Sequence, residues 1–332
     1  MSLVRPGPAP ASRGTLGADA LRRVANDRGR PCGPTVSVII PSYQRPGLAR
    51  RAIHSALWQT FDELEVILVD DASGDNTEEV VAAIDDPRVR YVRHDRNRGL
   101  AAARNTGIDN AEGAYVAFLD DDDLWLPEKL EKQVGCFRAA DDTLGLVHCG
   151  FMKCRMEPPY RTSIPDQAAM LAGDVLTVLL QGKAYALPSA TVIPRAVIEQ
   201  VGGFDEDFQR EEDTDLLLRV AARYPFAFLP DPFVLYADTP HSLMRNRPLV
   251  TRMRQKLLEK HKDLYAAFPG VYAERWAALA YQHLVLGDLA SARAAIDEAR
   301  KVDPTRPEVR RVSRRVAYPG LWRLGKRLRG QA

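Results

Sequence analysis

Four consecutive aspartates, 120 to 123, follow the apolar segment AYVAFL at 114–119. Neighbouring carboxylates repel one another, and burial would make them costly to ionise unless a cation lies close by. Alternate residues of an extended segment point the same way, so Asp120 and Asp122 could share one side. Together with substrate phosphates, such oxygen ligands suit Mg²⁺ or Mn²⁺. The run predicts a divalent-cation site. The alternative is a solvated acidic turn in which Asp123 caps the next helix, and taken alone the run fits both interpretations equally well.

Polar residues also follow two earlier strand-like segments. Residues 41–45 (PSYQR) come directly after VSVII, and Asp70 and Asp71 come at the end of EVILVD. In open α/β sheets, ligands bind beyond the carboxyl ends of the strands. The clustering of polar residues at these ends predicts one site along a single edge of a sheet.

Strand-like and helical segments alternate from residue 36 to residue 140. Short strands are predicted at 36–40, 65–70, 88–94 and 114–119, the first of them stopped by Pro41. Helices are predicted at 47–60, 76–84, 99–111 and 127–140. This alternation predicts an α/β fold with a mostly parallel, Rossmann-like sheet flanked by helices on both faces.

The second half of the chain is less regular and then entirely helical. Further strands are predicted at 144–151, 189–194 and 226–237, and helices at 194–201 and 213–224. Beyond Leu249 the pattern is helical to about Val302, with two helices joined at Gly287 and followed by Pro304. This pair resembles one tetratricopeptide unit, which cannot bury its own apolar face and must pack on a neighbouring domain or a partner.

Four motifs occur in the order VSVIIPSYQR, ILVDDAS, NRGLAAARNTGIDNAEGAYVAFLDDDDLW and GGFDEDFQREEDTDLLLR. Across about residues 35–240 they closely resemble the family 2 glycosyltransferases, which have the A-type nucleotide-sugar fold. The resemblance implies an inverting enzyme that moves a sugar from a nucleoside diphosphate sugar to an acceptor hydroxyl, by metal-assisted single displacement with an Asp base. It also implies a divalent cation, Mn²⁺ or Mg²⁺, and a role in polysaccharide, glycolipid or glycoconjugate biosynthesis.

The resemblance implies that the donor nucleotide binds at the first two strand ends. Pro41 and Tyr43 match positions that line the base, with the Tyr43 ring as a stacking surface, and Arg45 belongs to the same donor-binding segment. Asp71 matches the residue that accepts a hydrogen bond from the base. Simple packing of the Tyr43 ring is the alternative for that side chain.

Arg104 and the first two acids of the run are implied on the sugar and phosphate side of the donor. Arg104 matches a position near the base and the diphosphate, while Asp120 and Asp121 match positions that contact the ribose or the metal region. Because Arg104 falls in a predicted helix, an ion pair with Asp109 or Asp70 is its alternative role.

The resemblance also implies a metal ligand and a catalytic base. Asp122 ends the family's alternating acid motif and is the implied metal ligand, and Asp213 in REEDTDLLLR matches the catalytic base. His241 lies near the place where family members carry a histidine that approaches the diphosphate, with a shifted spacing, and is a second metal candidate. Asp215 and Arg219, four residues apart on one predicted helix, fit a structural surface pair better than catalysis.

The resemblance and the composition together divide the chain into four parts. The expected parts are a disordered N-terminal segment (1–33), a glycosyltransferase domain (34–245, with a nucleotide-sugar half at 34–125 and an acceptor half at 126–245), a helical extension (246–305) and a basic C-terminal tail (306–332). The first part is rich in Pro, Gly, Ala and Arg and has no apolar periodicity.

The basic tail combines cations with apolar residues. Its cations are Arg310, Arg311, Arg314, Arg315, Arg323, Lys326, Arg327 and Arg329, and the apolar residues near them are Leu321, Trp322, Leu324 and Leu328. A basic amphipathic end could rest on an anionic membrane near a lipid-linked acceptor. A solvated or disordered tail is the alternative.

Composition narrows the location and the partners. A net charge of +2 gives no general field for nucleic acid, and the first residues lack the apolar centre of a signal peptide. Four cysteines suit a reducing cytoplasm, where His148, Cys149 and Cys154 fit ordinary buried side chains better than a partial zinc site. We expect a cytoplasmic protein, or one peripheral at the inner face of the cell membrane. Its expected partners are a nucleotide-sugar donor and a saccharide, lipid-linked or small-molecule acceptor.

Two other functions explain parts of the pattern. A nucleotidyltransferase would carry a glycine-rich basic loop after the first strand, and PSYQRPG lacks repeated glycines and a lysine. A catalytically inactive relative that binds a nucleotide sugar or scaffolds partners would not need an intact EED at 211–213 or an intact acid run. Both features favour an active enzyme.

Overall fold

The computed structural model describes residues 33–140, 143–155, 161–164, 172–238 and 246–320. All structural statements below refer to these residues. Residues 1–32 of the predicted disordered segment and residues 321–332 of the basic tail lie outside them.

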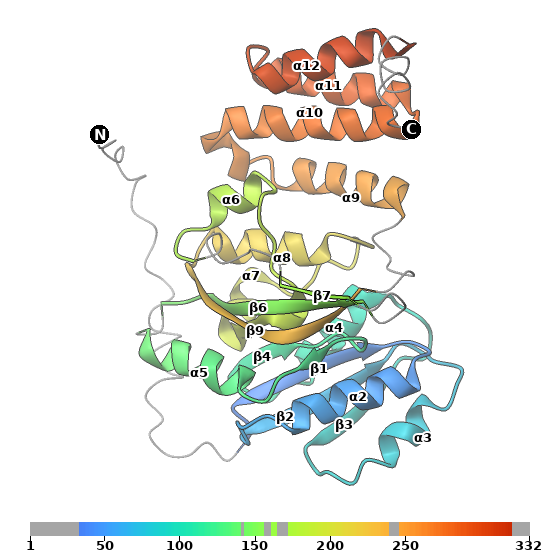
Figure 1. The fold of residues 1–332 in the computed structure, drawn as a ribbon, viewed down its shortest axis with the longest axis vertical. Helices are drawn as coiled ribbons and strands as arrows, with labels where there is room; N and C mark the ends of the chain where they lie inside the picture. The colour runs from blue at the N-terminus through green and yellow to red at the C-terminus, as the bar shows by residue number, and fades with distance from the viewer. Residues whose placement is uncertain (1–32, 141–142, 156–160, 165–171, 239–245, 321–332) are drawn as a thin grey trace.

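One nine-stranded sheet runs through the described part of the chain (Figure 1). Its strands are β1 (Val36–Ser42), β2 (Leu64–Asp70), β3 (Val89–Arg93), β4 (Tyr115–Phe118), β5 (Leu124–Trp125), β6 (Leu146–Arg155), β7 (Arg161–Ser163), β8 (Thr191–Pro194) and β9 (Phe226–Asp238). The main path is β3-β2-β1-β4-β8-β6-β9-β5, with β7 paired to β6. Pairing is parallel from β3 to β4, whereas β8 is antiparallel to both β4 and β6. The predicted α/β class is confirmed, and the second half of the sheet is mixed.

Helices cover both faces of this sheet. The described helices are α2 (Pro46–Leu57), α3 (Thr77–Ala82), α4 (Leu100–Asp109), α5 (Lys129–Ala139), α6 (Leu176–Leu180), α7 (Arg195–Val201), α8 (Glu212–Ala221), α9 (Arg247–Lys260), α10 (Pro269–Leu286), α11 (Leu289–Val302) and α12 (Pro307–Ala317), with 3₁₀ helices η1 (Pro188–Ala190) and η3 (Leu264–Ala267). Successive strand residues face opposite sides. Ile39 and Ile67 therefore pack with α4, α7 and α8, and Val38 and Val66 pack with α2 and α5. Both faces of β1 and β2 are buried, as in parallel sheets covered by helices, whereas the edge strand β3 is half-buried.

The C-terminal helices are stacked beyond α8, on the side of the sheet away from α2 and α3 (Figure 1). α10 ends at Gly287, which has a φ of 85°, and Asp288 caps α11 by accepting a hydrogen bond from the Ser291 N–H at 3.0 Å. Ala280 and Ala292 are fully buried, and such small residues let two helices pack closely. The predicted helical extension is confirmed, whereas its tetratricopeptide character and the division into domains stay predictions.

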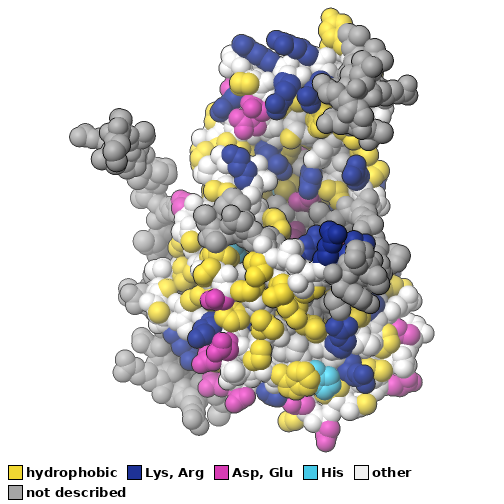
Figure 2. Space-filling view, in the orientation of Figure 1, with side chains coloured by type: hydrophobic (Ala, Val, Ile, Leu, Met, Phe, Trp, Pro, Cys, Tyr) yellow, Lys and Arg dark blue, Asp and Glu magenta, His cyan; other side chains and the backbone are white. Residues whose placement is uncertain are grey.

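α12 forms the first part of the predicted basic tail. Its Val309, Val312 and Val316 are buried against α10 and α11, and Figure 2 shows Lys and Arg side chains gathered at this end of the molecule. The apolar face of α12 is thus used for packing within the protein. The apolar residues on which the membrane hypothesis rests, between 321 and 328, lie outside the described residues. No helix in the described part of the chain has the length and apolar character needed to cross a bilayer.

β1 continues through Pro41 to Ser42, so the prediction that Pro41 stops the strand is wrong. The strand pairs with β2 up to Ser42 but with β4 only as far as Ile39. The Ile39 carbonyl accepts a hydrogen bond from the Leu119 N–H at 3.0 Å, which shows that the main chain of Ile39, and of Pro41 two residues later, faces β4. The missing N–H of proline therefore falls where no neighbouring strand remains to receive it.

Gly107 of α4 lies where this helix touches β1. A Cβ at this position would overlap the fully buried Ile39 side chain. We expect Gly107→Val to lower the free energy of unfolding by about 1–3 kcal/mol through overpacking. Gly135 of α5 is the control, because the space around its Cβ position is open, and Gly135→Ala should raise this free energy by up to about 1 kcal/mol. Urea denaturation of the two variants checks the prediction, and equal stabilities would contradict it.

Candidate active site

The carboxyl ends of β1, β2 and β4 meet at one edge of the sheet. The non-glycine residues with positive φ in the described part of the chain are Gln44 (56°), Ala72 (64°) and Glu211 (64°). The first two lie in the loops after β1 and β2, and the third precedes α8, which contacts the same edge through the ion pairs described below. Such backbone conformations are costly and persist where their surroundings fix them. Their gathering marks this edge as the candidate site.

Asp121 holds the loop that follows β1. Its Oδ2 accepts a hydrogen bond from the Ser42 hydroxyl at 2.8 Å, and its Oδ1 lies 3.1 Å from Nη1 of Arg45. Burial raises the pKa of Asp121 to about 6, against the opposing effects of Arg45 and Ser42. The second member of the acid run is therefore an anchor for residues 41–45.

Asp122 is the more open of the two central acids. Its side chain is 25% exposed, and its Oδ2 lies 3.4 Å from Nη1 of Arg45. Burial and the neighbouring charge of Asp120 raise the pKa of Asp122. A cation at this carboxylate would relieve both effects, which suits the predicted metal ligand.

Asp123 is a structural residue, and the alternative in which it caps the next helix is wrong. Its Oδ2 accepts a hydrogen bond from the Ser189 hydroxyl at 2.6 Å, and its Oδ1 accepts one from the Ala237 N–H at 2.9 Å. The Ser189 oxygen in turn accepts a hydrogen bond from the Asp120 N–H at 3.1 Å. Burial, followed by the charge of Asp120, raises the pKa of Asp123 well above its usual range. Asp123 thereby fastens the acid run to η1 and β9.

Arg104 of α4 joins the acid run to α8. Its guanidinium is buried, with Nη2 2.7 Å from Oδ1 of Asp120 and Nη1 2.9 Å from Oε1 of Glu212. Burial alone would lower the pKa of Arg104, but these two carboxylates raise it above its ordinary value. The alternative pairing with Asp109 or Asp70 is therefore wrong. The Arg104 side chain is buried and paired with Asp120. Its contact with the donor stays a prediction.

Three consecutive carboxylates, 211–213, lie at the N-cap and first turn of α8, and arginines pair with two of them. Oε1 of Glu211 lies 2.7 Å from Nε of Arg254 in α9, and Glu212 pairs with the buried arginine of α4. Asp213 instead accepts hydrogen bonds at Oδ1 from the N–H and the hydroxyl of Thr214, at 2.7 and 3.4 Å. Within the described residues, Asp213 is the member of this trio that has no ion pair.

The environment of Asp213 gives it the protonation behaviour of a base that works near neutral pH. Desolvation, and then the charges of Glu212 and Glu211, raise the pKa of Asp213 to about 7, while Arg104 opposes the rise. A carboxylate whose pKa lies near the working pH is suited to take a proton in a reaction. The predicted role of Asp213 fits this geometry.

Asp71 fixes the loop that precedes α4. Its Oδ1 accepts a hydrogen bond from the Arg98 N–H at 2.7 Å and lies 2.7 Å from Nδ1 of His94, and its Oδ2 accepts one from the Gly99 N–H at 2.8 Å. These contacts give Asp71 a structural role that the sequence did not reveal. Its predicted hydrogen bond to the donor base stays a prediction.

The remaining predicted residues differ in exposure. Pro41 is buried within β1, whereas the Tyr43 ring beyond the strand is 43% exposed. Stacking of the Tyr43 ring on the donor base, with simple packing as its alternative, stays a prediction. His241 lies outside the described residues, so its approach to the metal or diphosphate stays a prediction.

Ser189, Glu212 and Arg254 support the site and were not predicted as site residues. They lie 66, 108 and 43 residues along the chain from the side chains that they bind. No local spacing pattern connects positions so far apart. The available signals were the two polar residues, Ser189 and Thr191, of the otherwise apolar segment SATVIP, and the place of Glu212 in the EED motif at 211–213.

Asp215 and Arg219 form the predicted pair four residues apart, with Oδ2 of Asp215 2.7 Å from Nη2 of Arg219. Asp215 is fully buried rather than on the surface, and its Oδ1 also lies 2.7 Å from Nζ of Lys260 and 2.8 Å from Nε2 of His261. Burial would raise the pKa of Asp215, but these partners hold it below its ordinary range. Asp215 therefore fastens α9 to α8.

The acid run fits a cation that takes part of its ligands from a substrate. Among the residues that the structure describes, no three His, Cys, Asp or Glu side chains gather as a complete ligand set. This gives no support to zinc at His148, Cys149 and Cys154. Asp120 and Asp122 offer hard oxygen donors, and Mg²⁺ and Mn²⁺ commonly bind through one or two carboxylates plus substrate phosphates.

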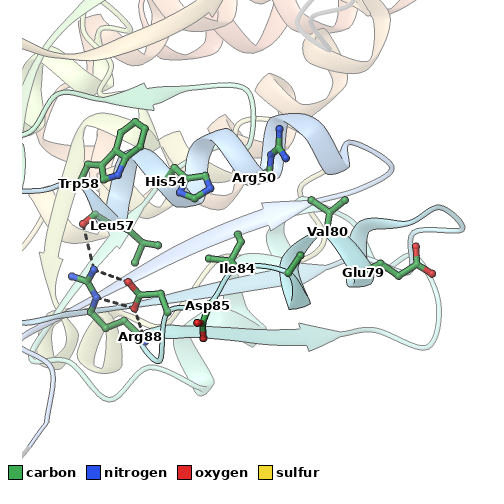
Figure 3. Close-up of a pocket in the computed structure, with 11 residues that line it drawn as sticks. Arg50, His54, Leu57, Trp58, Glu79, Val80, Ile84, Asp85 and Arg88 are labelled. Carbon is green, nitrogen blue, oxygen red and sulfur yellow. Dashed lines mark hydrogen bonds and ion pairs between the residues drawn. The ribbon is translucent and has the colours of Figure 1, made fainter.

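A surface hollow of about 660 Å³ lies between α2 and α3 (Figure 3). His54 and the exposed Trp58 border it, and Arg88 is fixed there by Asp86 and by the Leu57 carbonyl. The hollow contains none of the predicted site residues.

Comparison with known proteins identifies the family. The family model described as "Glycosyl transferase family 2" matches residues 37–200. The uncharacterized glycosyltransferase RP339 of Rickettsia prowazekii is 30% identical over 238 residues, which make up 71% of this chain and 71% of that protein. The chain belongs to glycosyltransferase family 2.

Other glycosyltransferases match over shorter stretches. The putative teichuronic acid biosynthesis glycosyltransferase TuaG of Bacillus subtilis is 44% identical over 103 residues, which are 30% of this chain and 41% of that protein. An uncharacterized glycosyltransferase of Rickettsia felis is 35% identical over 57% of this chain, and the chain spans 30% of the length of that relative. Among solved structures, the mannosyltransferase PcManGT of Pyrobaculum calidifontis, in complex with GDP-Man and Mn²⁺, has a TM-score of 0.57 at 23% identity over 91% of this chain and 86% of that chain. The likeness to PcManGT shows a shared fold.

The raised pKa of Asp213 predicts a pH-dependent stability of this glycosyltransferase. Between about pH 4 and 7 the folded protein keeps a proton on Asp213 that the unfolded chain has lost, so this group lowers stability as the pH rises through that range. Asp213→Asn keeps the shape and removes the charge. We expect the variant to melt at a higher temperature than the wild type at pH 8, with a smaller difference at pH 5.

Asp207→Asn is the control for this experiment, because the Asp207 side chain is 84% exposed. Its melting temperature should follow that of the wild type at both pH values. A lower melting temperature of Asp213→Asn at pH 8 would show that the charged carboxylate stabilises α8 instead.

Proposed function

We propose that this chain transfers a sugar from a nucleoside diphosphate sugar to an acceptor hydroxyl, with inversion at the anomeric carbon. The observation that carries the proposal is Asp213, a carboxylate with a pKa of about 7 and no ion pair in the described chain, linked through Glu212 and Arg104 to the acid run. A pathway for a polysaccharide, glycolipid or glycoconjugate is in keeping with the similarity to TuaG, a putative teichuronic acid biosynthesis glycosyltransferase. A saccharide, a lipid-linked sugar or a small molecule would serve as acceptor.

Asp213 is the base in this proposal. Thr214 binds Oδ1 of Asp213, which leaves Oδ2 for the acceptor hydroxyl. The acceptor proton passes to this carboxylate as the acceptor oxygen bonds to the anomeric carbon, and the bond from that carbon to the diphosphate oxygen breaks on the opposite side. No covalent enzyme intermediate is needed. A positioned base of this kind typically contributes 10²–10⁴-fold to the rate.

The donor is assigned to the edge formed by β1, β2 and β4. The exposed ring of Tyr43 would stack on the base beside Pro41 and Asp71, and Asp120 and Asp121 would contact the ribose or the metal region. PcManGT, which shares the fold, was solved with a nucleotide sugar and Mn²⁺, and this supports the donor class and the cation.

Asp122 is assigned as the ligand of a divalent cation, Mn²⁺ or Mg²⁺, with His241 as a second candidate. Such a cation, when bound, neutralises the charge that develops on the departing diphosphate. The protein's own part is to present an open carboxylate next to Asp120, whose charge makes the position attractive to a cation.

Removal of the base provides the main test. We expect Asp213→Asn to lower the release of nucleoside diphosphate from UDP- and GDP-sugars, in the presence of Mn²⁺, by at least about 10²-fold. Because the carboxylate must be deprotonated, the wild-type kcat/KM should rise about tenfold per pH unit below pH 7 and level off above it. Binding of UDP or GDP should be unchanged, since the base acts on the acceptor.

Three variants control this test. Glu211→Gln and Glu212→Gln should lose less activity than Asp213→Asn, and Asp207→Asn should lose none. Near wild-type turnover of Asp213→Asn, with chemistry shown to be rate-limiting, would remove Asp213 from the mechanism. An enzyme that binds the nucleotides but releases no product from any donor would be the inactive relative.

Loss of Asp122 tests the metal assignment. A nucleotide present at 100 times its dissociation constant stabilises a protein by about 2.7 kcal/mol. We expect Asp122→Ala to lose the Mn²⁺-dependent part of this stabilisation by UDP or GDP, because the cation links the carboxylate to the phosphates. The ligand-free melting temperature should not fall, because the substitution removes repulsion with Asp120. Full turnover of the wild type in excess chelator would refute the assignment.

A further inference from the structure

Arg45 lies between the two central carboxylates of the acid run. Its Nη1 is 3.1 Å from Oδ1 of Asp121 and 3.4 Å from Oδ2 of Asp122. The side chain is 42% exposed, so solvent reaches it while it makes both contacts. One positive charge of the protein therefore lies beside the carboxylate at which the proposed cation would bind.

The two contacts of Arg45 differ in strength. Asp121 is buried and has a second partner, the Ser42 hydroxyl at 2.8 Å, so it stays ordered without Arg45. Asp122 is more exposed, and its contact with Arg45 is longer. Because an exposed ion pair of this kind gives little net stabilisation, the contact with Asp122 can be broken at small cost.

Main-chain hydrogen bonds fix the backbone at residues 44 and 45, so a rotation of the Arg45 side chain does not require the loop to move. The preceding Gln44 has a φ of 56°, and its N–H donates to the Ser73 hydroxyl at 2.8 Å. The Arg45 carbonyl accepts hydrogen bonds from the N–H groups of Leu48 and Ala49 at 3.1 and 2.9 Å, at the start of α2. Rotation of the side chain would carry the guanidinium away from Asp122 and leave the loop in place.

We propose that Arg45 is a displaceable counter-ion that couples metal binding to donor binding, an inference that rests on the proposed function. Without ligands, Arg45 neutralises Asp122. A divalent cation at Asp122 repels the guanidinium, which then donates hydrogen bonds to the donor diphosphate. The diphosphate attracts both the metal ion and the Arg45 guanidinium. Metal binding frees Arg45 for the donor, and donor binding draws Arg45 away from the metal position. Metal and donor therefore bind with positive and reciprocal coupling.

The test measures how tightly the full-length wild type and its Arg45 variants bind Mn²⁺ in the absence of nucleotide. Electron paramagnetic resonance reports the concentration of free Mn²⁺. Arg45→Gln should bind Mn²⁺ about two- to fivefold more tightly than the wild type, a range typical of exposed ion pairs. Arg45→Lys keeps the charge and should resemble the wild type. With Mn²⁺ saturating, Arg45→Gln should bind UDP or GDP about tenfold more weakly or worse, because a hydrogen bond to a charged group is lost.

Arg306→Gln is the matched control. Arg306 is 41% exposed and also pairs with two carboxylates, those of Glu274 at 3.2 Å and Asp303 at 3.4 Å, in the helical extension. Its substitution should change neither affinity. A purely structural role of Arg45 would weaken both ligands together, whereas displacement tightens one and weakens the other.

The outcomes separate this inference from the proposed function. Mn²⁺ binding that is lost in Asp122→Ala but equal or weaker in Arg45→Gln than in the wild type overturns the role of Arg45 and leaves the metal assignment standing. Absence of Mn²⁺ binding by the wild type, with and without nucleotide, overturns both. Tighter Mn²⁺ binding by Arg45→Gln, together with weaker nucleotide binding, supports the coupling.

Discussion

The rest of the site depends on the two ion pairs made by the buried guanidinium of Arg104. It joins Asp120, two residues beyond the end of β4, to Glu212 at the start of α8, which is 108 residues from Arg104 along the chain. A charge this deeply buried is tolerated because two carboxylates surround it, and removal of one partner from such a group typically costs about 3–5 kcal/mol. The strand end with the proposed metal position and the helix with the proposed base are thus held in one arrangement. Asp213 takes its position from this contact, because it directly follows Glu212.

Around Arg104 the site holds more negative charge than its arginines neutralise. The acids at 120–123 and 211–213 meet three paired arginines. Burial, together with this excess of negative charge, raises the pKa of Asp121 to about 6 and that of Asp213 to about 7. The strained residues Gln44 and Ala72 add a backbone cost at the same edge. A site of this kind is less stable than a neutral one would be, which is common where function needs charge that packing alone would not retain. The same excess of negative charge would attract a cation to the proposed metal position and suits the proposed role of Asp213 as a base.

Much of the fold follows from local patterns, and most of the site's internal contacts do not. Apolar periodicity located β1 to β4 and their helices, because each depends on residues close together in sequence. It misplaced the end of β1, since the effect of Pro41 depends on where β4 stops. The sequence was enough to mark the acid run as a candidate site, but not to tell which of its aspartates are structural and which stay open. Asp123 serves structure because Ser189 and the Ala237 N–H reach it from distant segments, while Asp122 stays open because no comparable group does so in the described chain.

The helical extension is a structural part of the site, since α9 contacts α8 on both sides of the proposed base. Arg254 binds Glu211, two residues before Asp213, and Lys260 and His261 bind Asp215, two residues after it. Glu211 is in a left-handed conformation that a non-glycine residue keeps only when its surroundings hold it. The ion pair with Arg254 helps to keep Glu211 in this conformation, so the direction in which α8 begins depends on α9. α9 in turn packs against α10, and α10 against α11 and α12. The orientation of Asp213 is therefore set from two directions, by Arg104 of α4 and by α9 of the helical extension.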